Sequence, residues 1–168
     1  ALISPECSVD WLCLPFFDSP SVFGRILDDE KGGFFRISAK NIIKIEQHYA
    51  RHTPIVKTRF TTEEGVFEVT DYMPRFMTPQ QEVYCPPEIH RNIYLVSGNP
   101  QLVVDFKPSP NYGLGEGHFS IFPEYLKVQS SKGKYNSYYL YSNLDFEAVV
   151  NSKSITLTTS AYFLLSYH

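Results

Sequence analysis

The sequence has little cysteine and no apolar run long enough to cross a membrane. Its three cysteines, Cys7, Cys13 and Cys85, are an odd number at unrelated spacings, and no Cys-x-x-Cys pair is present. This pattern argues against a disulfide framework and against a zinc site, and it favours buried free thiols in a reducing compartment. The chain also lacks a charged-then-apolar leader. We therefore expect a soluble, cytoplasmic protein that binds no metal.

Basic residues are not in excess. The formal net charge is -3, and the 15 Lys and Arg residues are scattered along the chain, so nucleic acid is a poor candidate for a partner. Gly113, Gly115 and Gly117 resemble a phosphate-binding loop, but no βαβ pattern surrounds them and no Lys-Ser or Lys-Thr pair follows. We expect a plain loop there, and no cofactor.

Apolar and aromatic residues are plentiful, at 43% and 15% of the 168 residues, which is enough for one domain with its own core over residues 1–168. Helical periodicity is nearly absent. Short runs of Val, Ile, Thr, Tyr and Phe alternate with Gly, Pro, Asn and Ser, which predicts an all-β, two-sheet antiparallel sandwich. One helical turn is expected at residues 22–27, with Ser21 as its N-cap.

Two hairpins can be placed on the chain. One covers residues 55–73 and turns at 63–65, and the second joins 89–97 to 102–107 through a turn at 98–100. Residues 74–88 and 108–117 are expected to be irregular connections. The later strands are expected at residues 118–122, 126–130, 135–142, 146–150, 155–158 and 162–167.

The opening segment carries a resemblance. Residues 2–23 read LISPECSVDWLCLPFFDSPSVF. They resemble the start of the N-terminal domain of glycoside hydrolase family 15 enzymes, the glucoamylases and glucoamylase-like trehalases, whose usual pattern is SPDGSIDWLCLPRFDSPSVF. Further matches follow in the family's order at residues 32–37, 58–74, 95–98, 105–113 and 163–167, so the resemblance spans essentially the whole chain.

The resemblance implies a sandwich of the supersandwich type that precedes an α/α toroid bearing two catalytic glutamates. The periodic helical hairpins of a toroid are missing here, so no residue of this chain inherits a catalytic role. The implied function is a non-catalytic accessory domain of a glucan 1,4-α-glucosidase or a trehalase. Its partner would be the toroid of the same polypeptide, with the α-glucoside contacted only indirectly.

Two departures from the family pattern affect the opening segment. Glu6 and Cys7 stand where the family has an Asp-Gly turn, and because Cys tolerates positive φ poorly, we expect that turn to be rebuilt. Phe16 replaces the family's Arg, which removes an ion pair or sugar hydrogen bond and leaves an aromatic ring to pack on a neighbouring domain or a sugar.

The loop at residues 15–20 is the first candidate site, because prolines hold both of its ends and it presents two aromatic rings beside a carboxylate. The candidate residues are Trp11, Phe16, Phe17, Asp18 and Ser19. As a site, they would form a domain interface or the rim of a sugar pocket. The structural alternative is that Trp11 belongs to the core and that Asp18 and Ser19 cap a turn.

Tyrosines form the second candidate site. Tyr139 and Tyr141 fall on one face of a predicted strand and Tyr138 on the other, while Tyr135 precedes them. A pair of this kind can stack on sugars, so the alternative function is an independent carbohydrate-binding module for α-glucans. Tyrosine is equally an ordinary strand residue.

Four carboxylates, on Asp18, Asp71, Glu82 and Glu88, are the candidates for an acid and base pair. A glycosidase needs two carboxyl groups about 5 to 9 Å apart across the scissile bond. The sequence supports no particular pairing, so ordinary surface or turn carboxylates are the expectation, and an autonomous enzyme is the least favoured function.

Overall fold

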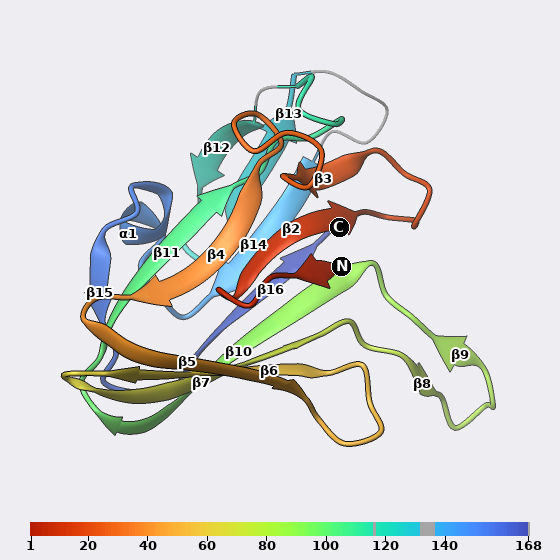
Figure 1. Ribbon diagram of the computed structural model, residues 1–168. Helices are drawn as coiled ribbons and strands as arrows, with labels where there is room; N and C mark the ends of the chain where they lie inside the picture. Colours follow the sequence, from red (N-terminus) through yellow and green to blue (C-terminus); the bar gives the residue numbers. More distant parts are fainter. Residues whose placement is uncertain (116, 132–136, 168) are drawn as a thin grey trace.

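The computed structural model describes residues 1–115, 117–131 and 137–167 (Figure 1). Nearly all regular structure in these residues is antiparallel β-sheet, and two large sheets enclose one hydrophobic core. The predicted all-β sandwich is confirmed. Both ends of the drawn chain lie on one side of the sandwich, near the end of β2.

One sheet has six strands in the order β1-β2-β4-β11-β15, and β3 pairs with β2 beside this path. Its strands are β1 (Leu2–Ile3), β2 (Ser8–Cys13), β3 (Ser21–Gly24), β4 (Phe34–Ala39), β11 (Gln101–Lys107) and β15 (Ser154–Thr156).

The other sheet has eight strands in the order β12-β13-β14-β16-β10-β7-β6-β5. Its strands are β5 (Ile42–Tyr49), β6 (Val56–Thr62), β7 (Gly65–Tyr72), β10 (Glu88–Gly98), β12 (Gly117–Ile121), β13 (Leu126–Ser130), β14 (Ser137–Ser142) and β16 (Ala161–Ser166).

Aromatic rings join the two sheets in the core. Phe35 on β4 meets Phe106 on β11 at 5.0 Å between ring centroids and Phe163 on β16 at 5.3 Å, both edge to face. Such pairs add about 0.5–1.5 kcal/mol beyond the burial of their area. All three rings are buried, so this cluster fixes how the sheets face each other.

The hairpin predicted at 55–73 is confirmed as β6 and β7, but the second predicted hairpin is wrong. β10 pairs with β7 and β16, whereas β11 pairs with β4 and β15 in the other sheet. The turn after Gly98 therefore carries the chain from one sheet to the other. Alternation shows that each segment is a strand with one buried face, but both sheets offer the same kind of buried face, so the pattern cannot reveal the partner.

The expected helical turn at residues 22–27 is also wrong, because residues 21–24 form β3. Leu12 and Phe23 are cross-strand partners, so pairing with β2 overrides the local helix signal. A helix occurs instead at α1 (Phe146–Val150), where a strand was expected. Asp145 is its N-cap, and the Asp145 side chain accepts a hydrogen bond from the Glu147 backbone N–H at 3.1 Å.

The remaining expected strands occur as β12, β13, β14, β15 and β16. β13 covers the expected residues, and the ends of the others lie at most two residues from the expected positions. The expected start of the strand at 135–142 lies outside the described residues. The connection at 74–88 is largely irregular, as predicted, but it contains a small hairpin of β8 (Phe76–Met77) and β9 (Val83–Tyr84). Figure 1 shows this hairpin projecting from the body of the sandwich.

Candidate functional site

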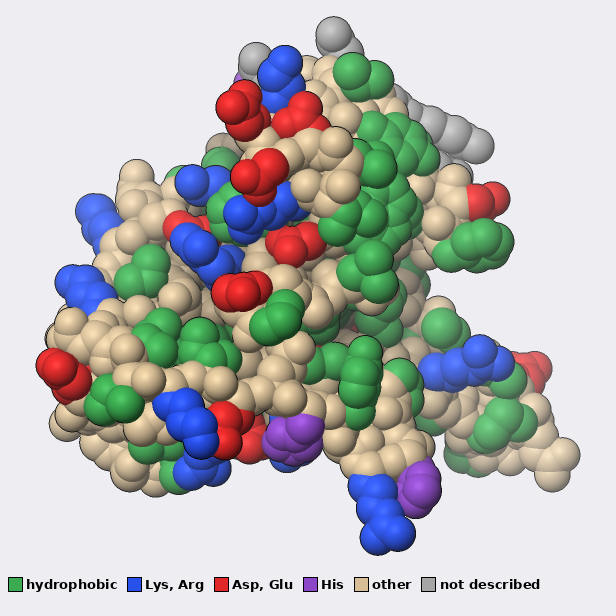
Figure 2. Space-filling model, in the orientation of Figure 1, with side chains coloured by type: hydrophobic (Ala, Val, Ile, Leu, Met, Phe, Trp, Pro, Cys, Tyr) green, Lys and Arg blue, Asp and Glu red, His purple; other side chains and the backbone are tan. Residues whose placement is uncertain are grey.

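A groove of about 770 Å³ lies between the 15–20 loop and the segment that carries β8 and β9. Its lining is apolar apart from one carboxylate and one guanidinium. Figure 2 shows hydrophobic surface on both projections, with a hollow between them. The lining residues are Ala1, Trp11, Leu12, Cys13, Pro15, Phe16, Phe17, Asp18, Met73, Arg75, Cys85, Pro86 and Pro87.

The 15–20 loop forms one wall of the groove because a tight turn closes it. The Ser19 backbone N–H donates to the Phe16 carbonyl at 3.1 Å, and the Phe16 N–H donates to Ser19 Oγ at 3.1 Å. With its ends tied in this way, the loop directs the rings outward: Phe16 is 61% exposed and Phe17 is 95% exposed. Large apolar side chains held in water mark contact surfaces more often than ordinary surface.

Four of the five residues predicted for this site therefore meet at the groove: Trp11, Phe16, Phe17 and Asp18. Ser19 does not line it, because its side chain is buried in the turn, as the structural alternative predicted. Trp11 is half-buried, and its ring centroid lies 6.3 Å from that of Tyr112. The Trp11 side chain is therefore partly packed inside the protein and partly open to the groove.

The sequence analysis missed the opposite side of the groove, where Met73, Arg75 and residues 85–87 lie, and it missed the small apolar hairpin between them in the chain. Phe76 and Tyr84 face each other across the small hairpin with ring centroids 5.1 Å apart, and Met77 and Val83 are exposed beside them. These four apolar residues form two adjacent pairs, 76–77 and 83–84, separated by polar residues and one proline. The signal that could have found them is that apolar pairs recur in a segment with no core strand to belong to.

Two thiols lie in the groove lining. Cys13 is half-buried and Cys85 is exposed, so the expectation that all three thiols are buried holds only for Cys7. All three are free, as predicted. Burial raises the pKa of the Cys13 thiol, which leaves it protonated and weakly reactive near neutral pH.

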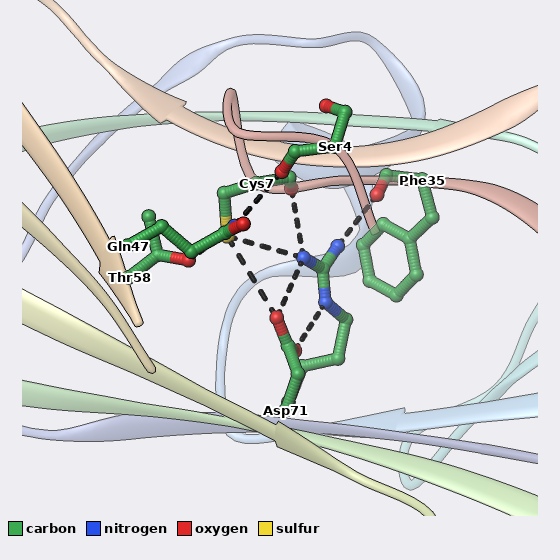
Figure 3. A network of polar contacts seen from close by, with 7 residues as sticks. Ser4, Cys7, Phe35, Gln47, Thr58 and Asp71 are labelled. Carbon is green, nitrogen blue, oxygen red and sulfur yellow. Dashed lines mark hydrogen bonds and ion pairs between the residues drawn. The ribbon is translucent and has the colours of Figure 1, made fainter. Parts of the chain in front are cut away.

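The turn that precedes β2 is anchored by Arg91, which lies on β10. Figure 3 shows the network of polar contacts to which Cys7, Phe35 and Asp71 belong. Arg91 Nε donates to Asp71 Oδ1 at 2.7 Å, and one Nη donates to the Cys7 carbonyl at 2.8 Å. A second Nη donates to the Phe35 carbonyl. One buried guanidinium thus ties the eight-stranded sheet to the strand that leads into the groove.

Cys7 corrects the expectation that the family's Asp-Gly turn is rebuilt. Its φ is +61°, so the left-handed conformation is kept without glycine. The Cys7 N–H donates to the Ser4 carbonyl at 3.0 Å, and the Arg91 guanidinium donates to Sγ at 3.2 Å. These contacts offset the cost of positive φ.

The tyrosine candidates lie apart from the groove, on the eight-stranded sheet. Tyr139 and Tyr141 are half-buried while Tyr138 is buried, which confirms that they share one strand face. Tyr125 lies 5.6 Å from Tyr139 and 5.8 Å from Tyr141, with its ring inclined by 67° and 53°. The three rings thus form an inclined cluster and not one flat platform. Tyr135 lies outside the described residues.

The four candidate carboxylates are spread over the molecule. Asp71 is buried against Arg91, and Glu88 Oε1 lies 2.9 Å from His90 Nε2. Asp18 lines the groove and Glu82 is exposed near the small hairpin. Among the described residues no group of His, Cys, Asp and Glu side chains is arranged to hold a metal ion.

Residues 1–154 match the family described as trehalase-like, N-terminal. The chain belongs to this trehalase-like N-terminal domain family. The resemblance seen in the sequence is thereby confirmed, since this domain is the one found in family 15 trehalases. Both walls of the groove lie inside the matched residues.

Proteins similar to this trehalase-like N-terminal domain are named as trehalases. That of Thermoplasma acidophilum is 35% identical over 114 residues, which cover 66% of this chain and 19% of the relative. Trehalase 2 of Sulfolobus acidocaldarius is 35% identical over 112 residues, 67% of this chain and 17% of the relative. The Mycobacterium tuberculosis trehalase is 31% identical over 126 residues, 66% of this chain and 18% of the relative.

The matched part of this domain spans less than a fifth of those relatives. No solved structure matches the chain. Among the described residues, no helix is long and apolar enough to cross a membrane.

Proposed function

We propose that this chain is a non-catalytic accessory domain of a trehalase-type hydrolase, and that the groove is the surface on which the catalytic part of the same polypeptide docks. The observation that carries the proposal is the apolar groove wall held out in water by the turn at Ser19. Large apolar side chains that are exposed together on one surface are typical of an interface. The phenyl ring of Phe17 would enter the partner as an anchor.

The distribution of carboxylates supports a non-catalytic role. Asp71 forms a buried ion pair with Arg91, and Glu88 is paired with His90. Asp18 is the one candidate carboxylate that lines the groove. A glycosidase needs two carboxyl groups that flank one bond, and the groove lining supplies one.

We propose trehalose as the substrate of the parent enzyme because the similar proteins are named trehalases. A glucoamylase remains the second candidate, since the substrate would be selected in the catalytic part. We also propose a cytoplasmic location. It is supported by three free thiols, one of them exposed, which a reducing compartment preserves.

The test measures glucose release from trehalose and from maltooligosaccharides, with this chain alone and with the chain extended through its catalytic region. We expect activity from the extended protein alone, with trehalose preferred. Turnover by the isolated chain would overturn the accessory role. Preference for maltooligosaccharides would assign a glucoamylase parent.

A matched pair of variants tests the groove itself. Phe17→Ser in the extended protein should lower its thermal stability and its activity, because an anchor of the domain interface is lost. Tyr94→Ser, which also removes an exposed aromatic ring but lies on β10, should leave both unchanged. Equal effects of the two variants would remove the groove as the docking surface.

A further inference from the structure

The free edge of β5 is the longest exposed strand edge in the described part of the chain. β5 has eight residues and pairs with β6 on one side, and no other described strand pairs with its second side. The other strands at sheet edges have five residues or fewer. Every residue of β5 except Ile45 is exposed. An unpaired edge of this length is a template for another strand.

On the side away from β6, no described strand pairs with the backbone groups of β5. The Ala50 N–H donates to the Ile55 carbonyl at 2.8 Å, just beyond the paired strands. Because hydrogen-bonded and non-hydrogen-bonded pairs alternate along an antiparallel ladder, the N–H and C=O groups of Ile45, Gln47 and Tyr49 point away from β6. The edge can therefore accept a partner strand without any change in β5.

Two charged side chains disfavour pairing of the β5 edge with an arbitrary strand. Lys44 and Glu46 are 62% and 51% exposed, and Lys44 Nζ lies 2.7 Å from Glu46 Oε1 within the same strand. Charged side chains on an edge strand discourage pairing with an arbitrary apolar strand, because such a partner leaves them without a counter-charge. A partner that carries the opposite charges in register is the exception.

We propose that β5 pairs antiparallel with β5 of a second copy of this chain, about a two-fold axis through Ile45. In a continuous antiparallel sheet, the side chains of two paired residues point to the same face. Two identical strands meet this condition only when one residue pairs with its own copy, and the two-fold axis lies at that residue. With the axis at Ile45, Lys44 of each copy faces Glu46 of the other. With the axis at Lys44 or at Glu46, like charges would face each other.

The contact is short. A register shift between Ile42 and Lys44 leaves Ile43 out of the regular pairing of β5, so the regular part of the dimer ladder covers residues 44–46 of each copy, with Ile43 and Gln47 at its ends. Ile43, which is 66% exposed, gains cover opposite Gln47 of the second copy. An interface below about 1,200 Å² gives weak, concentration-dependent association. No residue of β5 lines the groove, so this dimer is independent of the proposed docking function.

Sedimentation velocity of this chain from about 10 µM to about 1 mM tests the proposal, a range that brackets a weak dimer. We expect the wild type to shift from monomer toward dimer as its concentration rises. Lys44→Glu and Glu46→Lys should each remain monomeric, because each places like charges opposite one another. The double variant K44E/E46K restores both opposite-charge pairs and should dimerise like the wild type.

Mixing the two single variants provides the sharpest control. K44E carries two acidic residues and E46K two basic ones, so an equimolar mixture should form a heterodimer although neither variant self-associates. Phe17→Ser, in the groove, should leave the wild-type dimer intact. The proposal is wrong if the wild type stays monomeric throughout, if the double variant or the mixture fails to associate, or if Phe17→Ser abolishes association.

Discussion

Arg91 and Asp71 stand directly opposite each other on β10 and β7 and form a fully buried ion pair, with Arg91 Nε 2.7 Å from Asp71 Oδ1. The pair does more than join adjacent strands. The same guanidinium donates to the carbonyls of Cys7 and Phe35, which belong to the opposite side of the sandwich. A single charged residue is thus shared between the two sheets.

Removing one member of this pair should be strongly destabilising. We expect Arg91→Met or Asp71→Leu to lower the free energy of unfolding by about 3–5 kcal/mol, because each leaves a buried charge without its partner. Urea unfolding followed by circular dichroism measures the loss. Arg25→Met breaks the exposed pair with Asp29 and should cost at most about 1 kcal/mol.

The double variant Asp71→Leu/Arg91→Met separates the two causes of that loss. With both charges replaced by apolar groups, no unpaired charge remains, so the protein should be more stable than either single variant. If the double variant loses as much free energy of unfolding as the two single variants together, the hydrogen bonds to Cys7 and Phe35, and not the charge pairing, carry the stability.

The three thiols should differ in reactivity. Burial raises the pKa of Cys7 to about 12, whereas Cys85 is exposed and Cys13 is half-buried. At about pH 8, a maleimide or a disulfide reagent should modify Cys85 first and Cys13 more slowly, since the thiolate is the reactive form. Peptide mapping by mass spectrometry identifies each site. Modification of Cys7 in the folded protein, at a rate matching Cys85, would contradict its burial.

Alkaline pH should destabilise the protein through Tyr138. Burial raises its pKa to about 12, from an ordinary value of 10. Below pH 10 the phenol is neutral in both states and its contribution is fully present. Between about pH 10 and 12 the unfolded chain ionises first, so stability falls as pH rises, at up to about 1.4 kcal/mol per pH unit. Tyr138→Phe should show a shallower loss in urea titrations at successive pH values, and an unchanged slope would contradict this.

The N-cap of α1 can be tested by Asp145→Ala. Its carboxylate accepts from the Glu147 N–H at the start of the helix, and the loss of such a cap costs about 1 kcal/mol. Thermal unfolding detects the change. Lys153→Ala removes an exposed side chain two residues after the cap that ends α1 and should have little effect. An Asp145→Ala variant as stable as the wild type would mean that packing of Phe146 alone holds the helix.

Local pattern was sufficient for most strands and for one wall of the groove. Alternation located β6, β7, β10 and β11 because one face of each is buried, and side-chain direction has a period of two. The motif at residues 2–23 identified the family and the 15–20 loop, since both depend on contiguous residues. A helical turn was expected at 22–27 and a strand at 146–150, and the structure has the reverse. Short apolar segments of this kind fit the helical period and the strand period equally well.

The all-β class, the family and the loop that presents Phe16 and Phe17 can all be predicted from contiguous stretches of sequence. Three features depend on the folded arrangement: β10 and β11 lie in different sheets, Asp71 forms a buried ion pair with Arg91, and residues from both the 15–20 loop and the 73–87 segment line the groove. The difference lies in the sequence separation over which each interaction acts. Side-chain alternation and turn chemistry act between neighbours in the chain, whereas strand partners, buried ion pairs and groove walls bring together residues far apart in sequence whose pairing no local pattern encodes.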